Sequence, residues 1–123
     1  MKKVIILIPV FNDWDSLDKL LIEIEKNIKD LPELIIECYV VNDASTIPSP
    51  KLKKPDIFKT LKILNMKANK GHARCNAFGI RYITQNEKFD YLILMDGDGE
   101  DRPSELKSLI KEAIENPNCS VVA

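Results

Sequence analysis

The chain has 123 residues, of which 45% are hydrophobic and 30% are charged, and its formal net charge is −1 at pH 7. This length suits one domain with a real core and is too short for two. The near-neutral charge predicts no electrostatic attraction to nucleic acid or to an anionic membrane. No apolar run approaches the roughly 20 residues that a membrane-spanning helix needs.

Three cysteines, Cys38, Cys75 and Cys119, occur without any C-x-x-C spacing. This argues against a disulfide framework and against a zinc or redox motif. A reducing, cytoplasmic setting fits best. Peripheral attachment of the full-length protein to the inner face of the membrane stays open.

In the first half of the chain, apolar runs predict strands at Val4–Ile8 and Leu34–Val41. Between them, leucines and isoleucines at helical spacing predict a helix over Ser16–Asp30. The proline-containing segment Thr46–Lys59 is expected to be a loop. We expect Trp14 to be an aromatic residue at the surface or at an edge, with a platform for the acceptor as the alternative.

In the second half, strands are predicted at Leu61–Leu64, Phe89–Met95 and Cys119–Ala123. A helix over Gly71–Thr84 is expected to turn Ala73, Ala77, Ile80 and also Ile83 toward the core. A second helix starts at Pro103, which suits a first helical turn, and ends before Pro117. The residues that it is expected to bury are Leu106, Leu109, Ile110, Ala113 and Ile114.

Strands that alternate with helices predict an α/β fold, with a mostly parallel sheet between two layers of helices. Residues 1–123 are expected to form a single domain. Because the sequence ends inside an apolar run, we expect an N-terminal part of a longer protein, truncated at the C-terminus.

Polar segments follow three of the predicted strands, at 9–13, 42–45 and 96–98. In a parallel sheet these strand ends meet at one edge, which is where open α/β sheets bind ligands. Asp96 and Asp98 are one residue apart, and paired carboxylates suit Mg²⁺ or Mn²⁺ with positions left for phosphates. Such a site suits an enzyme that handles a nucleoside diphosphate.

Four segments, in order, resemble the inverting family 2 glycosyltransferases, which have the Rossmann-like GT-A fold. Val-Ile-Ile-Leu-Ile-Pro-Val-Phe-Asn-Asp (4–13) resembles their opening strand, and Tyr-Val-Val-Asn-Asp-Ala-Ser-Thr (39–46) their Val-Asp-Asp-Gly-Ser segment. Asn-Lys-Gly-His-Ala-Arg-Cys-Asn-Ala-Phe-Gly (69–79) is similar to Asn-x-Gly-x-x-x-Ala-x-Asn-x-Gly. Leu-Met-Asp-Gly-Asp-Gly-Glu-Asp-Arg-Pro (94–103) resembles a stretch typical of the dolichyl- or polyprenyl-phosphate mannose synthase-like branch.

The resemblance implies a role for each matching residue. Asp43 would hydrogen-bond the base edge, accepting from an imino N–H that uracil and guanine carry. Arg74 would lie near the base or diphosphate. Asp96 would bear on the ribose and the metal, and Asp98 would be the main ligand of Mn²⁺ or Mg²⁺. The nucleotide pocket would be lined by Pro9, Phe11 and Asp13.

The reaction implied is transfer of a sugar from a UDP- or GDP-sugar, with inversion, to an acceptor hydroxyl or a polyprenyl phosphate. The family's general base comes from beyond this segment, so no residue here takes that role. The acceptor stays open among lipid-linked, polysaccharide and protein substrates, as does homo-oligomer formation. Asn42 stands where the family has the first Asp of its pair.

Two other classes of function remain. A sugar nucleotidyltransferase shares the layout, but the glycine-rich loop expected after its first strand is missing here. A non-catalytic nucleotide-binding or interaction module is the second alternative, because the acceptor side is missing. His72, the only histidine, is expected to be structural or solvent-facing, and contact with a phosphate is the alternative.

Overall fold

Strands and helices alternate along the residues that the computed structural model describes, which are 2–31, 34–96 and 103–115. No helix among them is both long enough and apolar enough to cross a bilayer. The elements in chain order are β1 (Lys2–Val10), α1 (Trp14–Ile28), β2 (Leu34–Asn42), β3 (Phe58–Asn65), α2 (His72–Asn86), β4 (Tyr91–Leu94) and α3 (Pro103–Glu115).

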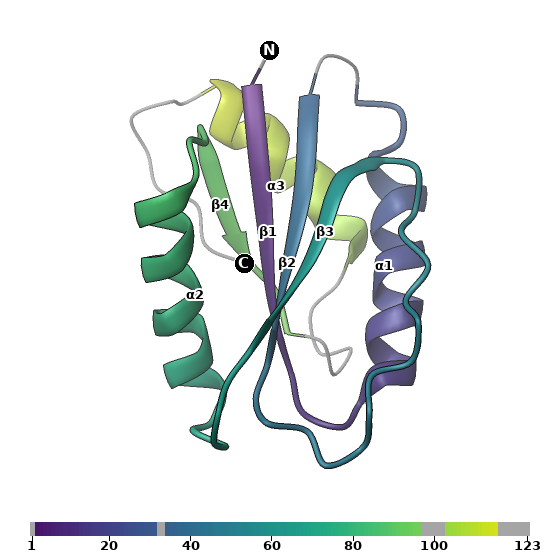
Figure 1. The fold of residues 1–123 in the computed structure, drawn as a ribbon. Coiled ribbons are helices and arrows are strands. Elements are labelled where there is room, and N and C mark those ends of the chain that lie inside the picture. The colour runs from purple at the N-terminus through teal and green to yellow at the C-terminus, as the bar shows by residue number, and fades with distance from the viewer. Residues whose placement is uncertain (1, 32–33, 97–102, 116–123) are drawn as a thin grey trace.

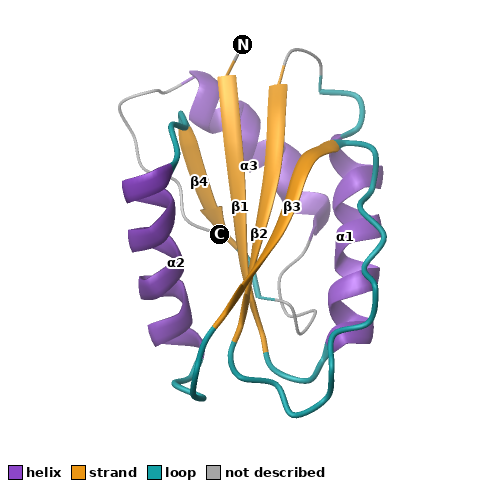
Figure 2. Ribbon diagram, viewed as in Figure 1, coloured by secondary structure: helices purple, strands orange, loops and turns teal. Residues whose placement is uncertain are grey.

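The four strands form one parallel sheet in the order β3-β2-β1-β4. α1 and α3 pack together on one face, and α2 covers the other (Figure 1). Figure 2 shows the same three layers by secondary structure. The predicted three-layer α/β/α sandwich is therefore confirmed. The carboxyl ends of β1, β2 and β3 lie together at the lower edge in Figure 1.

β1 is a central strand, and every residue from Val4 to Val10 is buried. Its unbroken apolar run fits a strand covered by helices on both faces. The register with β2 runs from the Lys2–Leu34 pair to the Val10–Asn42 pair without a slip. The two loops that follow β1 and β2 therefore start side by side.

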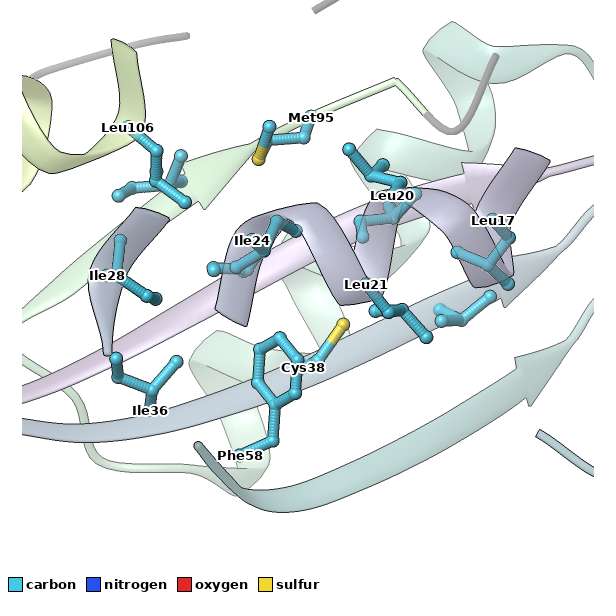
Figure 3. Packing of buried hydrophobic residues seen from close by; sticks show 14 of the residues in the cluster. Leu17, Leu20, Leu21, Ile24, Ile28, Ile36, Cys38, Phe58, Met95 and Leu106 are labelled. Carbon is cyan, nitrogen blue, oxygen red and sulfur yellow. The ribbon is translucent and has the colours of Figure 1, made fainter. Parts of the chain in front are cut away.

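The larger core lies between the sheet and the α1–α3 layer. Figure 3 shows side chains of α1 gathered with side chains from β2, β3 and α3 in this layer. The helix contributes residues at helical spacing, as predicted, and each of the following is at most 4% exposed: Leu17, Leu20, Leu21, Ile24 and Ile28.

α2 turns a different face to the sheet from the predicted one. Ala73, Ala77 and Ile80 are exposed, so the prediction was wrong for these three residues, whereas it is confirmed for the fully buried Ile83. The buried residues are Cys75, Gly79 and Ile83. They follow helical spacing equally well, and the missing side chain of Gly79 lets the helix approach the sheet closely.

Several other predictions differ in detail. Trp14 is 3% exposed at the start of α1, not at the surface, because its ring joins the larger core. In α3, Ile114 is 38% exposed and is not a core residue. β3 begins at Phe58, inside the segment that we expected to be a loop. The predicted strand Cys119–Ala123 lies outside the described residues.

Candidate functional site

The direction in which successive strands are added to the sheet reverses beside β1. The chain passes from β1 to β2 and then to β3 on one side, whereas β4 pairs with the opposite side of β1. In open α/β sheets, ligands bind beyond the carboxyl strand ends at such a switch in strand order. The loop after β1 and the residues after β4 flank this point, and both carry predicted site residues.

Asn12 joins the loop after β1 to the loop after β2. Its backbone N–H donates to Ser45 Oγ at 2.9 Å, and its side-chain Nδ2 donates to Thr46 Oγ1 at 3.0 Å. Its Oδ1 accepts from the N–H of Ile47 at 2.8 Å. The ring of Trp14 adds a fourth tie, because Nε1 donates to the Ile47 carbonyl at 2.9 Å.

These contacts make the two loops one unit, and our sequence reasoning missed them. Asn12 has a φ of 61°, and Asn is among the residues that enter the left-handed region most readily. That preference was the available signal. That preference does not predict the partners of Asn12, because they lie more than 30 residues away in the chain.

The three residues predicted from the first motif lie in different settings. Pro9 is buried within β1, opposite Val41 of β2. Phe11 is 40% exposed just past the end of the strand. Asp13 is exposed at the start of α1, where its carbonyl accepts from the N–H of Leu17 at 3.1 Å.

Asp43 follows β2 and is only 1% exposed. Its Oδ1 accepts from the backbone N–H of Lys70 at 2.7 Å, and its Oδ2 accepts from that of Gly71 at 2.9 Å. Burial would raise the pKa of this carboxyl, but hydrogen bonds from Lys70, from the Cys75 thiol and from Gly71 together lower it below 3.8. The carboxylate is therefore ionised at neutral pH.

Asn42 ties the ends of β2 and β3 together. Its side chain donates to Asn65 Oδ1 at 3.0 Å and accepts from the N–H of Ser45 at 3.0 Å. Its carbonyl accepts from the N–H of Met66 at 2.8 Å. The side-chain amide that stands at the place of the family's first Asp thus has one partner at the end of β3 and one in the loop after β2.

The start of α2 meets the residues after β4. His72 Nδ1 lies 3.8 Å from Asp96 Oδ1, and the two side chains are 42% and 40% exposed. Arg74 is exposed in the first turn of the same helix. The structure therefore brings Asp96, His72 and the Asp43-bound turn to one edge.

Of the predicted metal pair, Asp96 follows β4, and Asp98 lies outside the described residues. Among residues 2–31, 34–96 and 103–115, no group of three or more His, Cys, Asp or Glu side chains is placed to hold a metal ion. Asp96 supplies a half-exposed carboxylate of the kind that Mg²⁺ and Mn²⁺ prefer. That donor is compatible with the predicted ion.

A family model described as glycosyl transferase family 2 matches residues 5–123. The chain belongs to this family. Its fold is shared with crystal structures of S. aureus TarS, at 22% sequence identity and TM-scores of 0.68 and 0.69. These matches cover 94% of this chain and 20% and 32% of the TarS chains, and the second structure holds UDP-GlcNAc.

This family 2 chain is also similar to an uncharacterized protein of Methanocaldococcus jannaschii. The two are 29% identical over 122 residues, which is 96% of this chain and 49% of the relative. The chain thus spans about half of that relative and a smaller share of TarS. The expected placement in the dolichyl-phosphate mannose synthase-like branch stays a prediction.

Proposed function

We propose that this chain is the donor-binding part of a glycosyltransferase that uses a UDP- or GDP-sugar. The observation that carries the proposal is the joining of the loops after β1, β2 and β3 at the carboxyl edge of the sheet, next to the switch in strand order. Asn12 bonds the loop after β1 to the loop after β2, and Asp43 bonds the latter to the turn before α2. An edge held in this way is preorganised for a ligand.

In this proposal the residues around the edge have separate roles. The exposed ring of Phe11 stacks against the base or ribose, and Pro9 shapes the strand that carries it. Asp13 lines the pocket, and Arg74 meets the diphosphate. Asp96 serves the ribose and the metal side. The exposure of Phe11, Asp13 and Arg74 supports these roles.

Asp96 and Asp98 would hold the divalent ion, Mn²⁺ or Mg²⁺. When bound, the ion would act as a Lewis acid on the leaving diphosphate. Asp98 comes two residues after Asp96 in the chain. The carboxylate of Asp96 supports this assignment by its chemistry, since hard cations prefer oxygen ligands.

The proposed reaction is attack by an acceptor hydroxyl or polyprenyl phosphate on the anomeric carbon, with inversion. The leaving group is the nucleoside diphosphate. Its negative charge would be stabilised at the carboxyl edge of the sheet. The proposed donor-site residues do not include the general base or the residues that bind the acceptor. The complex of TarS with UDP-GlcNAc supports UDP as the first nucleotide to test.

Calorimetric titration of the protein with UDP and with GDP, each with and without Mn²⁺, tests the proposal. We expect one of them to bind, and Mn²⁺ to tighten binding. Asp98→Asn should remove the effect of Mn²⁺, whereas Glu112→Gln on α3 serves as a charge-matched control that keeps it. A folded wild type that binds neither nucleotide would refute the proposed function.

A further inference from the structure

A buried thiol contacts the carboxylate of Asp43. Cys75 lies near the start of α2 and is fully buried. Its backbone N–H donates to the Gly71 carbonyl at 3.1 Å, and the N–H of Gly71 donates to Asp43 Oδ2 at 2.9 Å. The first turn of the helix thus brings the side chain of Cys75 to Asp43, and the thiol donates a hydrogen bond to the carboxylate.

The thiol of Cys75 is a hydrogen-bond donor at neutral pH. Burial, the hydrogen bond to Asp43 and the negative charge of that carboxylate raise the pKa of Cys75 to about 12. The family segment that residues 69–79 resemble has Ala at this place, and an Ala side chain has no hydrogen to donate. The contact between Cys75 and Asp43 is therefore a feature of this chain and not of the motif.

Three donors of the protein share the carboxylate of Asp43. The backbone N–H groups of Lys70 and Gly71 lie 2.7 and 2.9 Å from its two oxygens, and the Cys75 thiol is the third donor. Since an ionised carboxylate has about four acceptor positions, one position is left for a ligand. A single free position suits a single donor, such as the imino N–H of a base.

The direction of this free position depends on how firmly the carboxylate is held. The backbone of Asp43 is fixed at the end of β2, because its N–H donates to the Val10 carbonyl at 2.9 Å. The side chain is only 1% exposed. Rotation of the carboxylate would break at least one of its three hydrogen bonds, and leaving a buried donor unpaired is costly.

We infer that Cys75 is a positioning residue for base selection, whose thiol holds Asp43 so that one lone pair is left to accept from the imino N–H of uracil or guanine. The inference rests on the proposed function, since it concerns the nucleotide site. Without the thiol, two acceptor positions are open, and the carboxylate can turn between them. Discrimination between bases then weakens, although the backbone of the site stays in place.

The test compares nucleotides that carry the imino N–H with nucleotides that lack it. Wild type and Cys75→Ala are titrated calorimetrically with UDP, CDP, GDP and ADP in the presence of Mn²⁺. Cys75→Ala should lower the ratio of UDP to CDP affinity, or of GDP to ADP affinity, by about fivefold, because one hydrogen bond to a charged group is lost. Cys75→Ser restores a donor at the same place, so its ratio should return to within about twofold of the wild-type ratio.

Cys38→Ala is the matched control, because Cys38 is also a fully buried thiol. It belongs to the larger core on the other face of the sheet, and burial alone raises its pKa. This variant should lose stability and keep the wild-type ratio. An unchanged ratio in Cys75→Ala, an equal fall in Cys38→Ala, or a ratio that Cys75→Ser does not restore would overturn the inference.

The S–H stretching band gives a second measurement, which needs no change at position 75. In a protein with Cys38→Ala and Cys119→Ala, Cys75 is the only thiol. Its infrared band should lie at the lower frequency of a hydrogen-bonded thiol, both with and without nucleotide. A band at the frequency of a free thiol would overturn the inference. A wild type that binds no nucleotide would instead refute the proposed function itself.

Discussion

Ala44 turns the chain away from the end of β2 with a φ of 55°. In this left-handed region an L side chain costs about 1–2 kcal/mol, because Cβ crowds the following carbonyl. The family segment that residues 39–46 resemble has Gly at this place. The strain sits between Asp43, which holds α2, and Ser45, which accepts a hydrogen bond from Asn12.

Ala44→Gly should therefore stabilise the protein. Relief of the strain outweighs the added entropy of a glycine in the unfolded chain, and the free energy of unfolding should rise by about 0.5–1 kcal/mol. Urea denaturation measures this change. Ala77→Gly, at an exposed position of α2, should instead lose about 1 kcal/mol. A lower free energy of unfolding for Ala44→Gly would show that Ala44 is not strained.

α2 meets the sheet through Gly79. A Cβ placed there would lie 2.6 and 2.9 Å from the two Cδ atoms of Leu7 and 3.1 Å from Val41 Cγ2. Leu7 and Val41 are both fully buried, so neither has free space to move into. The absence of a side chain at Gly79 thus sets how closely the helix packs.

Gly79→Val should destabilise the protein, because the added methyl groups overpack the helix–sheet contact. Overpacking of this kind costs about 1–3 kcal/mol. Ala77→Val, on the exposed side of the same helix, is the matched control and should change stability by less than about 0.7 kcal/mol. Thermal unfolding of both variants provides the comparison, and equal losses would argue against the close contact.

The sequence predicted the strands better than it predicted the orientation of α2. The apolar run of β1 predicts a buried strand whichever face each side chain takes, because helices cover both faces of the sheet. In α2, two stripes have helical spacing, one with Ala73, Ala77 and Ile80 and the other with Cys75, Gly79 and Ile83. The choice depends on Leu7 beneath Gly79, which is distant in sequence.

For the candidate site, the sequence predicted where residues lie but not which contacts they make. Parallel strand ends place Asp43 and Asp96 at one edge, and the structure agrees. What each side chain does there depends on loops that meet across the sheet. The bonds from Asn12 to Thr46 and Ile47, and those from Lys70 and Gly71 to Asp43, have no signature in local sequence.

At the scale of the whole molecule, a second polar network lies on the α2 face, away from the candidate site. Lys3 Nζ is 2.5 Å from Glu37 Oε1 and 3.6 Å from Glu87 Oε2. Lys62 lies 3.5 Å from Glu87, and the Tyr39 hydroxyl donates to the same carboxylate. Glu37 is only 6% exposed, so its charge depends on these partners.

This network should make the protein sensitive to acid. Burial would raise the pKa of Glu37, but hydrogen bonds from Lys3 and Thr60 and the charge of Lys3 lower it below 4.5. The hydrogen bond from Tyr39 is the main cause that lowers the pKa of Glu87. A carboxyl with a lowered pKa stabilises the fold above its unfolded-state pKa, and this contribution is lost as the pH falls through the folded-state value.

We therefore expect the free energy of unfolding to decline as the pH falls below about 4.5, the ordinary Glu value. Lys3→Gln removes the main partner of Glu37, so acid unfolding should begin at a higher pH. Lys2→Gln is the control, because Lys2 is largely exposed and lies 3.9 Å from Asp90. Identical acid transitions in the two variants would show that the network is not responsible.

Nucleotide is proposed to bind at the carboxyl edge of the sheet. The most direct test is an NMR titration of the protein with UDP and with GDP in the presence of Mg²⁺. We expect amide shifts at Phe11, Ala44, Gly71 and Asp96, and none at Glu37. Shifts centred on the network around Glu37, or no shifts with either nucleotide, would contradict it.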